Sequence, residues 1–573
     1  MIRGPEPPAP AGEPMTDSNS SLILPRPVPE ADAGPLDERF YDLAEARARR
    51  LFHANPVLAS YFGVHGEDAR MGDPSIDAVE AEIADERAHL AAVEALDSAG
   101  LSPAVRFERD LEVHNLRLGL FDQDEVRNWH RRPSAAGDVG DAIFLLFARG
   151  AAPLSERLAT ITDRLEAVPA YLEASKSRAK GAPVATWQET DLRNGDDLPY
   201  LFAEVRTAAD DALPKGELAR LDRAIANAQT ALEGWSGWLR KGLEKADNNW
   251  PLGAERYDEL VRLRAFGDLD ADAILAIGEE QLRKNHEGRR AAALEVDPLA
   301  DEATVIDRLK NDHPDTFEGA LEGYRDAMAR SRAYLIEHDI VTVPDDETID
   351  VIPTPEYLRS VMPFAAYFSP ARFDADRRGL YVVTPAVDND PNAMREHYWA
   401  SISNTSIHEA YPGHHLQLHV ANAHPSVTRM LTDAPEFVEG WGMYSEQLMR
   451  EEGFVAGPAF RTAMFTDAVW RSCRIILDVK MHRGQISEDD ATDFLVEHTA
   501  FETANARAEV RRYTYTPGYQ LSYLLGKVLI LGLREEERRR LGAAFSLKGF
   551  HDTLLRNGSL PISFHRRLLR GEG

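Results

Sequence analysis

The sequence predicts a mainly α-helical protein with a small β-sheet, and two patterns lead to this prediction. Apolar residues recur at spacings of three and four over long stretches, as in amphipathic helices. Between residues 341 and 385 this pattern gives way to prolines that alternate with β-branched and aromatic runs, which are typical of short strands. The chain has 573 residues, of which 43% are hydrophobic, so it is long enough to form several folding units.

The first 36 residues are predicted to be a disordered tail. They hold nine of the 34 prolines and, apart from Leu22-Ile23-Leu24, little that could be buried. They also lack the apolar core of a signal peptide. Met15 lies inside this tail and is an alternative start of translation.

Residues 37–340 are predicted to form a helical region. One apolar stripe follows Pro214, which suits a helix start, and it consists of Leu218, Leu221, Ile225, Ala228, Leu232, Trp235 and Leu239. A second stripe follows Pro153 and consists of Leu154, Leu158, Ile161, Leu165 and Val168. Both stripes predict buried core, and this region contains no catalytic constellation.

Residues 341–573 form the predicted functional region. Two runs are expected to be strands, at residues 348–352 and 379–384. The second run is a candidate exposed edge that could hold an extended peptide through main-chain hydrogen bonds. After Asn392 the helical pattern returns and continues to the end of the chain.

Composition disfavours several classes of protein. The net charge of −30 has the wrong sign for binding nucleic acid or an anionic membrane surface. No apolar stretch approaches the ~18 residues of a membrane span, so no membrane partner is expected. The single cysteine, Cys473, cannot form an internal disulfide and fits a reducing compartment, so we expect a cytoplasmic protein.

Histidines cluster in the functional region. Of 18 histidines, six fall within 28 residues: His397, His408, His414, His415, His419 and His424. His408-Glu409 begins like the zinc-protease signature, in which two histidines one helical turn apart hold Zn²⁺ and the intervening Glu activates water. The position four residues after His408 is Pro412, however, and proline cannot bind metal.

The spacing after His408 requires an interrupted helix if these histidines share a metal. On a straight helix His414 points ~240° away from His408, while His415 returns to the same face ~10 Å further along. Pro412 and Gly413 predict a bulge or break between them. The alternative is a helix end at which the imidazoles act as caps.

A hydrolytic zinc site needs a third protein ligand and an open position. The segment from Asp433 begins with helix-start residues and places Glu439 and Glu446 two turns apart on one face. Glu439 is the better ligand candidate, and Glu446 is expected to pair with Arg450. Taken alone, either acid would by default face solvent.

These motifs resemble a known bacterial family. The segment His408-Glu409-x-x-Pro412-Gly413-His414-His415-x-Gln417, followed by Glu439-Gly440-Trp441-x-x-Tyr444-x-Glu446, is similar to the family called domain of unknown function 885. The likeness continues in order through Arg471-x-x-Arg474-x-x-x-Asp478-x-x-x-His482, Glu509-x-x-Arg512-Tyr513, Pro517-Gly518, Ser522-Tyr523, Gly526, Phe550-His551 and Leu560-Pro561. Tyr519 and Gln520 depart from it, because the family usually has Gln-Ala there.

That family in turn resembles the helical gluzincin peptidases of the thimet oligopeptidase kind, whose third ligand is a Glu in a similar Phe-Val-Glu context. The resemblance implies a large helical metallopeptidase-like fold with the sheet beside the metal helix. Aligning the Glu with Glu439 makes His414, rather than His415, the second histidine ligand. It also implies a cleft, with residues 37–340 as one wall, that admits short peptides.

Further residues are candidates to support catalysis. Arg471, Arg474, Asp478 and His482 share one helix face. Asp478 is spaced to orient His482 at the edge of a metal site, with a structural salt-bridge network as the equal alternative. Tyr519 and Tyr523 share a face near Pro517, and either phenol could donate to an oxyanion. Tyr523 is preferred because it matches the family.

The sequence as a whole therefore predicts a zinc-dependent hydrolase of peptide or peptide-like amide bonds. Zn²⁺ would be held by His408, His414 and Glu439, with Glu409 as general base and with Tyr523, Arg512 and His482 in supporting catalytic roles. The alternative is a non-catalytic helical binding or scaffold protein that keeps the architecture. Substrate identity, endo- or exopeptidase action, the choice between His414 and His415 as second ligand, and oligomeric state stay open.

Overall fold

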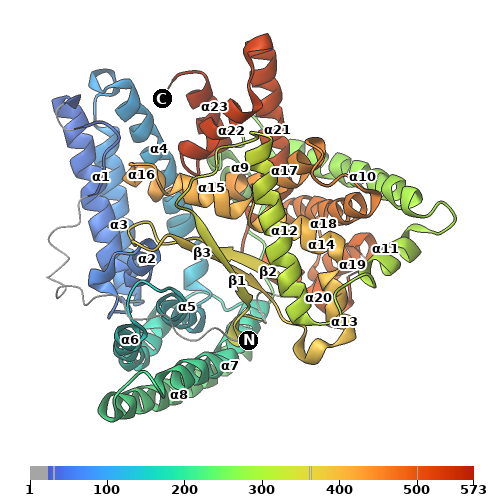
Figure 1. The fold of residues 1–573 in the computed structure, drawn as a ribbon. Helices are drawn as coiled ribbons and strands as arrows, with labels where there is room; N and C mark the ends of the chain where they lie inside the picture. Colours follow the sequence, from blue (N-terminus) through green and yellow to red (C-terminus); the bar gives the residue numbers. More distant parts are fainter. Residues whose placement is uncertain (1–23, 30–31, 360–361, 363, 500, 573) are drawn as a thin grey trace.

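The computed structural model describes residues 24–29, 32–359, 362, 364–499 and 501–572 and is mainly helical with one small sheet (Figure 1). The predicted fold class is confirmed. Most of the predicted disordered tail, residues 1–23, lies outside the described residues. For Leu24 the tail prediction is wrong, because this side chain is buried against Ala48 and Phe52. Within the described part of the chain, no helix combines the length and apolar character needed to cross a membrane.

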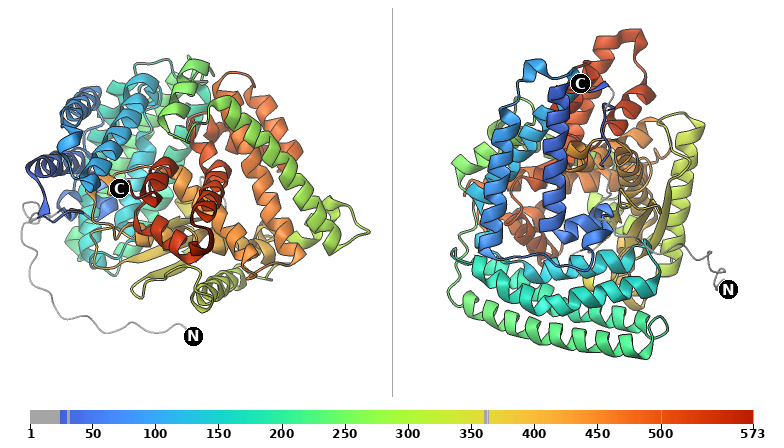
Figure 2. Two further views of the ribbon diagram at one scale, coloured as in Figure 1. Left: turned by 90° about the horizontal axis from the view of Figure 1, so that it is seen from above. Right: turned by 90° about the vertical axis from the view of Figure 1, so that its left-hand side faces the viewer.

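Among the described residues, eight α-helices, α1 to α8, form the N-terminal part of the fold. The upright group in Figure 1 is α1 (Pro35–Ala54), α3 (Ile76–Glu94) and α4 (Pro103–Leu120), with the short α2 (Pro56–Phe62) at its foot. Beneath it, as the right-hand view of Figure 2 shows, lie α5 (Ala135–Ala148), α6 (Leu154–Ser175), α7 (Ala185–Ala209) and α8 (Lys215–Leu243). The two stripes predicted from sequence lie on α6 and α8 and line one apolar core.

Four helices lead into the sheet: α9 (Ala254–Leu263), α10 (Ala271–Val296), α11 (Glu302–Lys310) and α12 (Phe317–Glu337). After the sheet come α13 (Pro391–Met394), α14 (Trp399–Glu409), α15 (His414–Ala421), α16 (Val427–Met430), α17 (Pro435–Glu451), α18 (Pro458–His482), α19 (Glu488–Thr499), α20 (Thr503–Tyr513), α21 (Ser522–Leu541), α22 (Leu547–Arg556) and α23 (Ile562–Leu569). Leu282 of α10 shares a core with Val469 and Cys473 of α18, so residues on both sides of the predicted boundary at 340 pack together. The division into residues 37–340 and 341–573, with a cleft between them, remains a prediction.

The sheet has three strands in the order β1-β3-β2, namely β1 (Thr348–Pro353), β2 (Ala365–Phe368) and β3 (Arg378–Val383). β1 runs parallel to β3, and β2 runs antiparallel to it. The prediction that residues 379–384 form an exposed edge is wrong, because β3 is paired on both sides. β2 was not predicted from the sequence, because its four half-buried residues are too short a run to show a period-two pattern.

The sheet connects the helical layers. Val351, Tyr381 and Val383 pack against α12, and Phe368 meets Phe144 of α5 with ring centroids 5.3 Å apart.

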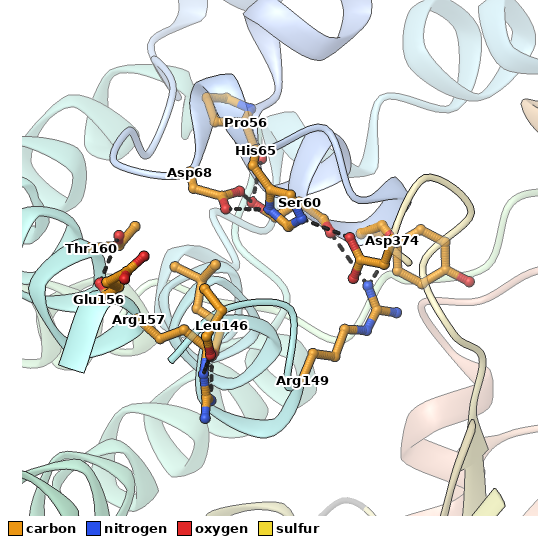
Figure 3. A network of polar contacts seen from close by, with 12 residues as sticks. Pro56, Ser60, His65, Asp68, Leu146, Arg149, Glu156, Arg157, Thr160 and Asp374 are labelled. Atoms are coloured by element: carbon orange, nitrogen blue, oxygen red, sulfur yellow. Dashed lines mark hydrogen bonds and ion pairs between the residues drawn. The ribbon is translucent and has the colours of Figure 1, made fainter. Parts of the chain in front are cut away.

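A polar network also holds the loop before β3 (Figure 3). His65, in the turn after α2, lies between Asp68 and Asp374, with 2.6 Å from each ring nitrogen to a carboxylate oxygen. The hydrogen bonds with Asp374 and Asp68 raise the pKa of His65 to about 10. This charged contact ties the N-terminal helices to the strand that enters the sheet.

Candidate metal centre

The helix that carries His408 breaks where Pro412 and Gly413 predict a break. α14 ends at Glu409, and α15 begins at His414. A Cβ atom on Gly413 would lie 1.8 Å from the His408 carbonyl oxygen, so only glycine fits this turn. The indole of Trp441, on α17, donates to the Pro412 carbonyl oxygen over 2.7 Å and fixes the turn.

This break brings His414 back beside His408. Their ring centroids lie 4.7 Å apart, and ligand-type atoms of His408, Glu409 and His414 lie within 4.8 Å of one another. Oε2 of Glu439 lies 3.7 Å from His408 Nε2 and 3.4 Å from His414 Nε2. The structure therefore brings together all three predicted ligands and the predicted base.

Space for His408 depends on the helix opposite. Gly442 of α17 faces the imidazole, and a Cβ atom there would lie 2.7 Å from two of its ring atoms. Any larger residue would displace the ring. In the Glu-Gly-Trp-Gly run of α17, Glu439 is thus a ligand candidate, Trp441 fixes the turn, and Gly442 leaves space for the His408 ring.

Glu446 orients His408. Its Oε1 lies 2.7 Å from His408 Nδ1, and its Oε2 accepts a hydrogen bond from Asn404 over 3.2 Å. The expectation that Glu446 pairs with Arg450 is therefore wrong. Its position two turns after Glu439, on the same face, was the signal that it belongs to the site. A carboxylate on the far nitrogen leaves Nε2 free to bind metal, as in many metal-bound histidines.

Tyr519 holds the other ligand. It lies in a short turn, η11 (Tyr519–Leu521), and its hydroxyl donates to Glu439 Oε1 over 3.0 Å. The negative charge of Glu439, together with burial, raises the pKa of Tyr519 above its ordinary value, so the phenol stays a donor. With Oε1 held in this way, Oε2 faces the two imidazoles.

Tyr523, the preferred oxyanion donor, lies one step further from the cluster. Its hydroxyl is 3.5 Å from that of Tyr519. Tyr523 was preferred from the sequence because Tyr519 departs from the family pattern, yet Tyr519 is the one that contacts a ligand candidate.

The electrostatics of the cluster favour a cation. Burial opposes charge on both His408 and Glu439. The Glu439 carboxylate and the hydrogen bond with Glu446 nevertheless raise the pKa of His408 to about 10. The two histidines in turn hold the pKa of Glu439 well below its ordinary value. Carboxylates of Glu409, Glu439 and Glu446 surround two imidazoles, which is an environment suited to a divalent ion.

His415 belongs to a different network. Its Nε2 lies 2.8 Å from Glu347 Oε2, and its Nδ1 lies 3.0 Å from the Tyr367 hydroxyl. Glu347 also accepts hydrogen bonds from Tyr411 and Arg332. Both ring nitrogens of His415 are thus engaged away from the cluster. Glu347 was not predicted from the sequence, because it stands just before β1 in an irregular segment without a periodic pattern.

Two predicted catalytic residues lie outside the cluster. His482 is buried, and its Nε2 lies 3.0 Å from the Tyr513 carbonyl oxygen but 3.9 Å from Asp478. The prediction that Asp478 orients His482 is wrong, because Asp478 instead accepts hydrogen bonds from the Tyr257 hydroxyl and the Gly518 amide. Arg512 pairs with Glu509 over 3.0 Å.

The donor set fits zinc. Ligand atoms about 2.0–2.1 Å from a tetrahedral ion are roughly 3.4 Å apart, and Glu439 Oε2 lies 3.7 and 3.4 Å from the two imidazole nitrogens. The side chains of His408, His414 and Glu439 keep 8, 10 and 14% exposure. The cluster is therefore mostly buried but not fully closed to solvent, and a catalytic site differs from a structural one in keeping an open position.

Two solved structures have a similar fold. One is described as a candidate lipoprotein of unknown function from Shewanella oneidensis, with a TM-score of 0.75 and 23% identity over 93% of this chain and 99% of that one. The other is a candidate lipoprotein from Colwellia psychrerythraea, with a TM-score of 0.82 and 18% identity over 94% of this chain and 99% of that one. No curated protein matches the chain. The model of a bacterial family of proteins of unknown function, DUF885, matches residues 56–569, and the chain belongs to that family.

Proposed function

We propose that this protein is a zinc-dependent hydrolase of peptide or peptide-like amide bonds, related in its site to the gluzincin peptidases. One observation carries the proposal. His408, His414 and Glu439 converge from two chain segments with ligand-atom spacings that suit zinc, and Glu409 lies beside them.

His408, His414 and Glu439 would hold the metal, which when bound lowers the pKa of a water ligand towards ~7 and polarises the substrate carbonyl. Glu446 and Tyr519 keep the ligands in place. Glu409 accepts a proton from the attacking water and passes it to the leaving amine. The hydroxyls of Tyr519 and Tyr523 are candidates to donate to the substrate oxygen as negative charge develops on it.

The first test is metal stoichiometry of the purified full-length protein, followed by turnover of a mixed library of short peptides. We expect one zinc per chain and cleavage that a chelator abolishes and added zinc restores. Bound zinc without any cleavage would support the scaffold alternative instead.

A matched pair of variants tests the ligand set. His414→Ala is expected to abolish zinc binding. His415→Ala is expected to retain zinc, because both of its ring nitrogens are engaged by Glu347 and Tyr367. Zinc loss in His415→Ala with retention in His414→Ala would overturn the assignment.

Localisation is a separate proposal. The buried single cysteine fits the reducing cytoplasm, whereas both similar structures are called lipoproteins. Cell fractionation decides between the two, since recovery in the membrane fraction would contradict a cytoplasmic location.

A further inference from the structure

We propose that Arg471, Arg474 and Arg512 form a site for the free C-terminal carboxylate of a peptide substrate, so that the protein acts as an exopeptidase at the carboxyl end. This inference rests on the proposed function, because it concerns the substrate of the same metal centre.

The three arginines lie on the flank of the metal centre. From Glu439, contacts run through the hydroxyls of Tyr519 and Tyr523, and the guanidinium of Arg474 lies 4.6 Å from the centre of the Tyr523 ring. A carboxylate bound there would lie within a few residues of the scissile bond, since an extended chain advances about 3.4 Å per residue.

A second set of contacts reaches the same arginines from His408. Asn404 donates to Glu446, the partner of His408, over 3.2 Å and to Asp467 over 2.9 Å. Asp467 in turn accepts a hydrogen bond from Arg471 over 3.3 Å. Chains of contacts from α18 and α20 thus reach the centre both at Glu439, through the tyrosines, and behind His408, through Asn404 and Glu446.

The arginine cluster carries unbalanced positive charge. Arg474 and Arg512 share one carboxylate, Glu509, each over 3.0 Å. Burial opposes ionisation of Glu509, but the two arginines lower its pKa to about 2. With Asp467 beside Arg471, three guanidinium groups face two carboxylates. In a chain with net charge −30, such a site is suited to a single anionic group.

The arginines differ in how fully their donors are used. Arg474 is fixed between the rings of Trp470 and Tyr523, at 4.0 and 4.6 Å, and donates to Glu509 and Tyr513. The main role of Arg474 is therefore to hold the neighbouring side chains of the site in place, because its donors are largely used within the protein.

Arg471 and Arg512 retain donors for a ligand. Nε of Arg471 is buried without a hydrogen-bond partner among the described residues. Arg512 donates from one Nη to Glu509. A guanidinium has five N–H donors in a fork that matches a carboxylate. Their side chains keep 16 and 29% exposure, so a ligand can reach them.

The test compares an N-acetylated tripeptide that has a free carboxyl group with its C-terminal amide. Binding is measured by calorimetry on full-length Glu409→Gln protein, both zinc-loaded and chelator-treated, because a free carboxylate can also bind zinc directly. We expect the acid to bind about 10- to 100-fold more tightly than the amide in both forms, as for a hydrogen-bonded charged group.

Arginine variants identify the site in the same Glu409→Gln background. Arg512→Gln and Arg471→Gln are expected to remove the preference for the acid. Arg511→Gln is the matched control and should keep the preference, because Arg511 pairs with Glu189 and Glu488 instead. Thermal unfolding verifies that each variant is folded.

Equal binding of acid and amide, binding of neither, or a preference that survives in both Arg512→Gln and Arg471→Gln would overturn the carboxylate site. Failure of the proposed function is a different result. In that case wild-type protein lacks zinc or cleaves neither the acid nor the amide.

Discussion

The core of α5–α8 and the interior around His408 are both buried, but they differ in the side chains that fill them. In α6 the buried positions include Leu158, Ile161, Leu165, Val168 and Leu172. In α14, α15 and α17 the buried positions include His408, His414, His415, Gln417, His419 and Glu446. The first region is mainly apolar, with a few buried polar side chains such as Thr162 and Arg164, whereas the second concentrates polar groups.

The two interiors contribute differently to folding. Burial of apolar area stabilises the fold by roughly 25 cal/mol per Å². A buried polar group destabilises it unless a hydrogen bond or a charge partner compensates. The α5–α8 core therefore stabilises the fold through its apolar contacts. The polar interior around His408 instead holds the candidate metal ligands in place, and its stability depends on the hydrogen-bond and charge partners of each buried group.

The largest expected effect is on catalysis and comes from Glu409→Gln. This change keeps size and hydrogen bonding but removes basicity, so turnover should fall by roughly 10²- to 10⁴-fold. Zinc content and the midpoint of thermal unfolding should stay near those of the wild type.

The exposed Glu396, which pairs with Lys310 over 3.1 Å, provides the control, and Glu396→Gln should leave turnover unchanged. If Glu409→Gln loses zinc, Glu409 is a ligand; if it cleaves at the original rate, the catalytic scheme is wrong.

The complementary change in the apolar core is Leu165→Ala. Leu165 is fully buried in α6, and truncation leaves a cavity, so the free energy of unfolding should fall by about 2–5 kcal/mol. Zinc stoichiometry at 25 °C should not change. Zinc loss from folded Leu165→Ala protein would show that the two regions are coupled more tightly than their separate cores suggest.

The same contrast explains what could be predicted from the sequence. The stripes on α6 and α8 are repeated many times, so a period of three to four residues was enough to place them. β2 has four residues, and without it β3 was misassigned as an edge. Local motifs likewise brought out His408, Glu439 and the pair His414 and His415.

Partners contributed from distant segments could not be matched to each other from local spacing. Glu347 reaches His415 across 68 positions of sequence, and Glu446 reaches His408 across 38. Spacing within one helix favoured Arg450 for Glu446 and Asp478 for His482. In both cases tertiary contacts provided a different partner, because a buried polar atom pairs with whatever the fold brings within hydrogen-bond distance.

A smaller effect is expected from Glu446→Gln. The amide keeps the shape but removes the charge that orients His408, so zinc affinity should fall by roughly 10- to 100-fold, as is usual for a carboxylate behind a metal-bound histidine. Competition with a fluorescent chelator measures this. Glu451, on the same helix, pairs with Arg534 over 2.9 Å, and Glu451→Gln should leave affinity unaltered. Unchanged affinity in Glu446→Gln would reduce Glu446 to a packing role.

The smallest expected effect on zinc affinity separates the two tyrosines. Tyr519 donates to Glu439 over 3.0 Å, whereas Tyr523 reaches only the Tyr519 hydroxyl, over 3.5 Å. If Tyr519 only holds the ligand, Tyr519→Phe should lower zinc affinity by roughly 10-fold and leave kcat of the zinc-saturated enzyme nearly intact. If Tyr523 donates to the oxyanion, Tyr523→Phe should lower kcat by roughly 10²-fold with KM and zinc affinity unchanged, because such donors act in the transition state.

A kcat defect in Tyr519→Phe alone would transfer the oxyanion role to Tyr519. Wild-type kinetics in both variants would leave oxyanion stabilisation to the metal, and the phenols would then serve the fold only.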